Sequence, residues 1–85
     1  MKAHMDATRT RLGELGALAA RTEAAERRIL ELAEQRLEDV QAAITRARPG
    51  IEIAPPAAQD RYLSLVSERA QLSAVIARAK SALNL

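Results

Sequence analysis

The sequence contains no cysteine, phenylalanine or tryptophan, and it has a single tyrosine and a single histidine. Without cysteine, disulfide bonds and thiolate metal sites are excluded. The lone histidine, His4, has no partner residues at the spacing of a metal site or of a base–nucleophile pair. The near-absence of aromatic residues also removes the side chains on which single-stranded nucleic acids stack.

Long uncharged hydrophobic runs are missing as well. The opening residues, Met1 to Asp6, lack the apolar run of a secretion signal. No uncharged stretch approaches the roughly 18 residues that cross a bilayer. Alanine is abundant and arginine exceeds lysine, which is typical of a GC-rich bacterial or phage gene. We therefore expect a cytoplasmic protein, in a bacterium or in the host of a phage, with no membrane partner.

Catalytic and metal-binding motifs are absent from the sequence. It has no glycine-rich phosphate loop, nucleophile elbow or zinc-type spacing. The glutamates of the first half follow the i,i+4 pattern of a solvated helix surface, without the inward Glu-x-x-His elements of a helical metal site. We expect no enzyme activity, no cofactor, no metal ion and no small-molecule substrate.

Two apolar seams organise the rest of the chain. In each, residues recur at intervals of three and four, the pattern of paired helices. When the chain is folded at the prolines between the seams, Val40 lies level with Leu65 and Ala33 with Leu72. The sequence thus predicts an all-α fold built as an antiparallel two-helix hairpin. The first seam is Leu30, Ala33, Leu37, Val40, Ile44 and Ala47, and the second is Ala58, Tyr62, Leu65, Arg69, Leu72, Ile76, Ala79 and Leu83.

The loop of the hairpin is marked by proline and glycine. Pro49 ends the first helix and Gly50 is free to take a positive φ. Pro56 suits the first turn of the second helix. Ile51 and Ile53 are expected to pack over the end of the hairpin. The predicted boundaries of this single domain, residues 1–85, are a first helix at about 6–48, a loop at 49–55 and a second helix at about 56–84.

The first helix is predicted to extend beyond the second. The register places Leu83 level with Thr22 and Glu23, so residues before about 20 have no second-helix partner. This segment carries leucines on one side and glycines and alanines on the other, and monomeric proteins rarely expose such apolar surface. Three alternatives follow: a kink that folds the segment back at Gly13 or Gly16, two chains pairing into a four-helix bundle, or a different protein covering the groove. The predicted partner interface is Leu12, Gly13, Leu15, Gly16, Ala17, Leu18, Ala20 and Ala24.

Three charged residues, Glu26, Arg36 and Arg69, fall at seam positions. Arg69 is either a buried charge awaiting a carboxylate from another chain or a packed stem whose guanidinium reaches water. Glu26 and Arg36 either specify register and oligomeric state, as polar seam residues can, or lie at the seam edge. Tyr62 is expected to anchor the core near the loop.

The second helix carries a family resemblance. Gln59-Asp60-Arg61-Tyr62, then Leu72 and Ser73-Ala74-Val75-Ile76, resembles the small helical-hairpin co-chaperones of type III secretion needle subunits. The resemblance covers residues 46–83. It implies a hairpin that helps a helical-repeat chaperone hold the needle subunit unpolymerised, and hence a foreign partner for the N-terminal segment.

Nucleic-acid binding is the competing class. Lys2, Arg9 and Arg11 would form a basic arm, but acidic residues interleave with basic ones along the chain and the net charge is only +2. We therefore expect a non-enzymatic protein–protein interaction module that works as a homodimer or in a hetero-complex: a small adaptor, inhibitor, structural subunit or co-chaperone.

Overall fold

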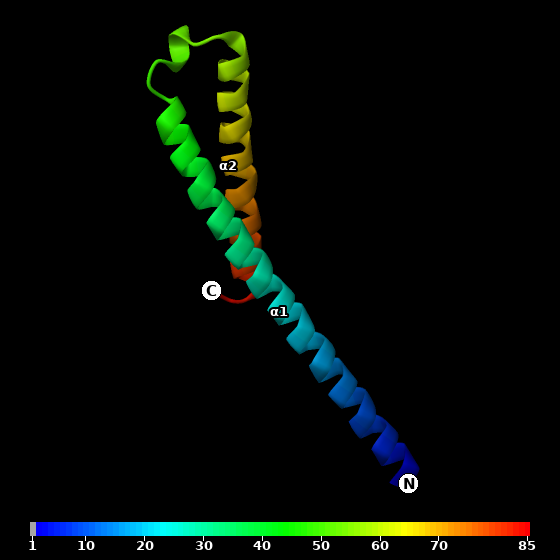
Figure 1. The fold of residues 1–85 in the computed structure, drawn as a ribbon. Coiled ribbons are helices and arrows are strands. Elements are labelled where there is room, and N and C mark those ends of the chain that lie inside the picture. The colour runs from blue at the N-terminus through cyan, green and yellow to red at the C-terminus, as the bar shows by residue number, and fades with distance from the viewer. Residues whose placement is uncertain (1) are drawn as a thin grey trace.

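The computed structural model describes the backbone of residues 2–85 and the side chains of residues 10–85. Two α-helices, α1 (Lys2–Ala47) and α2 (Pro56–Ala82), are joined through a short 3-10 helix, η1 (Ile51–Ile53). The helices run antiparallel and lie side by side near the loop (Figure 1). The all-α class and the helical hairpin predicted from the sequence are confirmed.

The core lies between α2 and the C-terminal half of α1. Val40 and Ile44 are each 1% exposed, and Ala33 and Ala79 are also buried. The remaining seam residues predicted from the sequence are all partly buried. The spacing of three and four therefore identifies the face that each helix buries, because residues so spaced lie above one another on a helix.

A type II turn closes the hairpin. The Ile51 amide donates to the Arg48 carbonyl at 3.2 Å, and Gly50 has φ 75° and ψ 9°. Glycine at the third turn position supplies the positive φ that this turn requires, and proline is common at the second. The Gln59 side chain of α2 then donates through Nε2 to the carbonyls of Ile51 (3.0 Å) and Glu52 (3.2 Å), which ties η1 to α2.

One expectation about the loop is wrong. Ile51 is partly buried, but Ile53 is 91% exposed and does not pack over the hairpin end. In a 3-10 helix each turn takes about three residues. Residues two apart therefore project in different directions, so both isoleucines cannot face the core.

Helix α2 ends at Ala82, slightly before the predicted end near residue 84. The Leu85 amide donates to the Lys80 carbonyl at 2.8 Å, and the Asn84 amide donates to the Ser81 carbonyl at 3.2 Å. Asn84 takes the left-handed conformation, with φ 60°. These two bonds form a Schellman motif, which satisfies carbonyls that the end of a helix leaves free.

Helix α1 is 46 residues long and extends far beyond the end of α2 (Figure 1). It begins at Lys2 rather than near residue 6, since neither glycine nor proline interrupts its first turns. The helix continues without a break through Gly13 and Gly16. The prediction about His4 lies outside the described side chains. We call residues 2–22 of α1 the overhang, and the hairpin with its overhang measures 78 × 20 × 14 Å.

Candidate protein interface

An ion pair joins the two helices outside the core. Arg36 of α1 donates through Nε to Oε2 of Glu68 at 3.0 Å and through Nη2 to Oε1 at 2.7 Å. This bidentate bond from Arg36 lowers the pKa of Glu68, and the same bond raises the pKa of Arg36. Arg36 thus lies at the edge of the seam. The sequence pattern did not single out Glu68, although it directly precedes the seam residue Arg69.

The overhang carries three exposed leucines. Leu12 is 63% exposed, Leu15 57% and Leu18 58%. Leu15 precedes the buried Ala33 by about five helical turns, since a turn takes roughly 3.6 residues. These three residues, which we call the leucine face, therefore lie on the side of α1 that α2 covers further along the helix. The leucine face is the core seam continued past the end of α2.

A notch of about 550 Å³ lies at the step where α2 ends. The Thr22 hydroxyl, which lines it, donates to the Leu18 carbonyl at 3.0 Å and so is already satisfied within α1. Leu83 lies across the notch from Thr22 and Glu23, the residues that the sequence register had placed level with it. The notch is lined by Leu15, Leu18, Ala19, Thr22, Glu23, Glu26, Ala82, Leu83 and Asn84.

The small-residue side of the overhang is also uncovered. Gly13, Gly16, Ala17, Ala20 and Ala24 are all exposed. A Cβ added at either Gly13 or Gly16 would meet nothing within 4 Å. No described part of this chain approaches these glycines, so a close approach there stays a prediction about a partner.

The two other charged seam residues have no polar partner in the described part of the chain. Glu26 is partly buried and lines the notch, and neither it nor Arg69 takes part in an ion pair or a side-chain hydrogen bond there. No buried side-chain nitrogen or oxygen among the described residues is left without a partner. The guanidinium of the partly buried Arg69 is therefore in contact with solvent in this chain.

A further apolar patch, which sequence analysis missed, lies on one flank of the hairpin. Ile29 is 43% exposed, Leu32 48% and Val75 38%. Arg36 and Glu68 face each other across one flank, and Ile29 and Val75 are each one heptad from them toward the open end of the hairpin. A heptad is nearly two whole turns, so both residues lie on that flank. We call Ile29, Leu32 and Val75 the flank patch.

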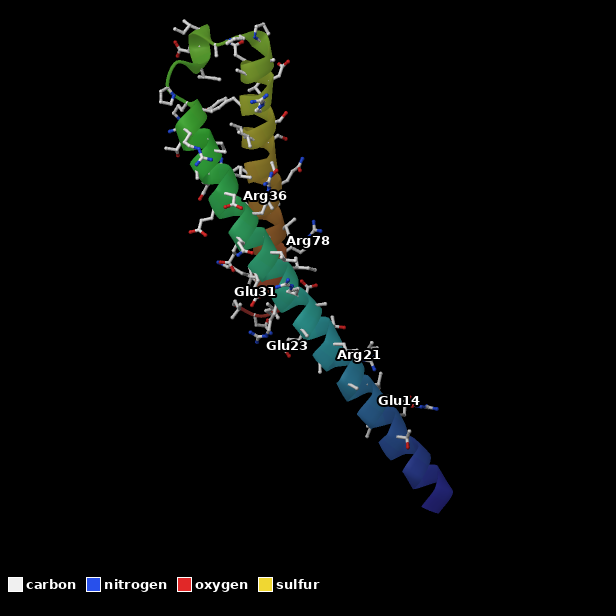
Figure 2. The ribbon with its side chains drawn as sticks, in the orientation of Figure 1. Glu14, Arg21, Glu23, Glu31, Arg36 and Arg78 are labelled. Atoms are coloured by element: carbon white, nitrogen blue, oxygen red, sulfur yellow. The ribbon has the colours of Figure 1, made fainter. Side chains whose placement is uncertain are left out.

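The rest of the described surface is charged and mixed in sign. Arg27 pairs with Glu23 at 2.9 Å and Arg28 with Glu31 at 3.3 Å, both within α1 and exposed. Such pairs contribute only tenths of a kcal/mol to the helix. Glu14 and Arg21 extend from the part of α1 that α2 does not accompany (Figure 2).

Among the residues that the structure describes, no group of three or more potential ligands could hold a metal ion. Likewise, no described helix is long and apolar enough to cross a membrane.

The fold defines the chain as a two-helix hairpin with an uncovered apolar extension. No protein-family model, curated protein or solved structure is found to match it.

Proposed function

We propose that this chain is a non-enzymatic protein–protein interaction module whose overhang binds a helix of another protein molecule. One observation carries the proposal: the leucine face is more than half exposed, although it lies on the same side of α1 as the core seam. That side is already shaped to receive an antiparallel helix, because α2 occupies it between residues 22 and 47. A partner helix would continue the packing that α2 begins.

The leucine face alone is too small for a stable complex. Fully burying a leucine contributes roughly 1.5–3 kcal/mol, and these three are already partly covered by their own helix. Association costs on the order of 4–15 kcal/mol in lost motional freedom. The partner must therefore bring apolar side chains of its own and contact further surface, such as the notch or the flank patch.

The finer expectations from the sequence belong to this proposal. Pairing of two chains into a four-helix bundle is one form that a self-pair could take. The stripe of glycine and alanine would offer a second side for close backbone approach. A kink that folds the segment back at Gly13 or Gly16 is the competing expectation, in which no partner is needed. A co-chaperone role, with a foreign partner on the same surface, is the alternative within this class.

Site-specific photo-crosslinking in the cells that make the protein tests the proposal. A photoreactive residue replaces Leu15 in one variant and Leu63 in the control, because Leu63 is an equally exposed leucine (64%) on α2. The variant at Leu15 should form a crosslink to a protein and the control should not. If position 15 yields no crosslinked protein, the proposal is wrong. A crosslink to a polypeptide other than this chain would favour the co-chaperone alternative over a self-pair.

A further inference from the structure

We infer that the occupant of the leucine face is a second copy of this chain, laid antiparallel so that Arg11 of each copy pairs with Glu26 of the other. This inference rests on the proposed function and adds the identity and direction of the partner.

The charges of the overhang favour this partner. Arg11 is exposed, Glu26 is partly buried in the notch, and neither has an ion-pair partner among residues 10–85. From Arg11 to Glu26 the intervals through Leu15, Leu18 and Thr22 are three or four residues. All five therefore lie along the same side of α1. A base and an acid thus stand at opposite ends of one apolar stretch.

Such a stretch is complementary to itself only when the two copies run antiparallel. A parallel pair would set Arg11 beside Arg11 and Glu26 beside Glu26, which like charges disfavour. In the antiparallel pair both contacts join opposite charges, and the two-fold axis passes between Leu18 and Ala19. Leu18 then faces Ala19 of the second copy and Leu15 faces Thr22, so that large side chains meet small ones. The contact is closed, because each copy uses the same surface.

The length of the overhang also fits a second copy. Its roughly 20 residues span about 30 Å, and an identical segment laid along it covers the leucine face from end to end. Because α2 occupies the seam side of α1 from about residue 22 on, the second copy leaves that side beside Glu26. Its residues before Arg11 then continue along the flank toward Ile29 and Leu32, which are exposed. Each copy thereby supplies the leucines and the flank patch that a single overhang lacks.

Charge reversal tests the pairing of Arg11 with Glu26. Sedimentation equilibrium of the full chain at low ionic strength, over a concentration series, should show a reversible monomer–dimer equilibrium. Arg11→Glu and Glu26→Arg should each weaken dimerisation by about tenfold or more, since each places like charges together twice in the dimer. The double variant should restore the wild-type dissociation constant to within about threefold. Arg61→Glu is the control, because Arg61 is an exposed cation near the start of α2, at the loop end of the hairpin and far from the overhang. Circular dichroism should show every variant to be helical.

Single cysteines test the direction of the pair, and the absence of native cysteine makes this assay clean. Ala19→Cys, next to the two-fold axis, should form a disulfide-linked dimer under mild oxidation. Leu12→Cys should not, because a disulfide requires Cα atoms about 4.4–6.8 Å apart. In a parallel pair both positions would crosslink.

The outcomes separate this inference from the proposed function. If the chain stays monomeric at every concentration, its partner is not a second copy. A crosslink from position 15 to another polypeptide would still support the proposed function. If neither charge reversal changes the dissociation constant of the dimer, Arg11 does not pair with Glu26. A disulfide at position 12 overturns the antiparallel direction.

Discussion

Arg36 and Glu68 form a contact between the two helices at the surface of the hairpin, outside its core. Their two hydrogen bonds, at 3.0 and 2.7 Å, join α1 to α2 outside the core. The seam of alanine, leucine and isoleucine tolerates sliding by a heptad, since its pattern repeats at that interval. A bidentate pair forms at a single register. Because the pair is partly exposed to water, we expect it to contribute little to stability.

The pKa of Glu68 leads to a prediction about pH. Because Arg36 lowers the pKa of Glu68 in the folded chain, the unfolded chain binds more protons between that lowered value and the ordinary glutamate pKa of about 4.3. The contribution of Glu68 is therefore complete above about pH 4.3 and is lost as the pH falls through its lowered pKa. In thermal unfolding followed by circular dichroism from pH 7 to pH 2, Glu68→Gln should lose less stability on acidification than the wild type.

The control for this prediction is Glu14→Gln, an exposed acid on the overhang that makes no bond to α2. It should retain the wild-type dependence on pH. Equal dependence on pH in Glu68→Gln and the wild type would show that the ion pair does not form in solution.

At the scale of the elements, the turn depends on one backbone conformation. Gly50 has φ 75°, and an L-residue in the left-handed region is less stable by roughly 1–2 kcal/mol. A Cβ at Gly50 would meet nothing within 4 Å, so the penalty is conformational and not a clash. We expect Gly50→Ala to lower the free energy of unfolding by about 1 kcal/mol, measured as a lower urea midpoint at an unchanged slope.

The same substitution in the overhang should act in the opposite direction. Gly13 is helical and its added Cβ would also find open space. Gly13→Ala should therefore favour helix by about 1 kcal/mol and increase the helical circular dichroism signal. A loss of helical signal in Gly13→Ala, or an unchanged midpoint in Gly50→Ala, would contradict this account of the two glycines.

Packing between the helices depends on a few side chains. Ile44 is 1% exposed, and truncating a buried isoleucine to alanine destabilises a protein by roughly 2–5 kcal/mol. Small domains have only about 5–15 kcal/mol in total. We expect Ile44→Ala to unfold a large share of the molecules near room temperature, as measured by urea unfolding. Ile53→Ala, at a site that is 91% exposed, should change stability by less than about 0.5 kcal/mol.

The two helices and the turn could be predicted from the sequence because each depends on residues close together in the chain. Spacing of three and four identifies the buried faces, and Pro49-Gly50 places the turn. Features that depend on geometry between elements were not predictable in the same way. The position of Ile53 depends on the pitch of a 3-10 helix, and the flank patch depends on which side of each helix α1 and α2 leave open. The leucine face was identified from periodicity, whereas the notch beside it depends on where α2 ends along α1.

At the scale of the whole molecule, the overhang makes association testable with one pair of variants. Leu15→Glu places a charge in the middle of the leucine face, and burying an unpaired carboxylate is strongly unfavourable. We expect this variant to stay monomeric in static light scattering over a concentration series at which the wild type associates. Leu63→Glu, at the similarly exposed leucine of α2, should associate like the wild type. Association of both variants to the wild-type extent would place the interface elsewhere.

The elongated outline has a consequence for any such experiment. A compact chain of this length has a radius of gyration of about 12 Å, whereas this hairpin has 21.7 Å. A rod 78 Å long diffuses and elutes from a sizing column as though it were a much heavier sphere. A lone chain would therefore pass for an oligomer against globular standards. Stoichiometry has to come from a mass measured independently of friction.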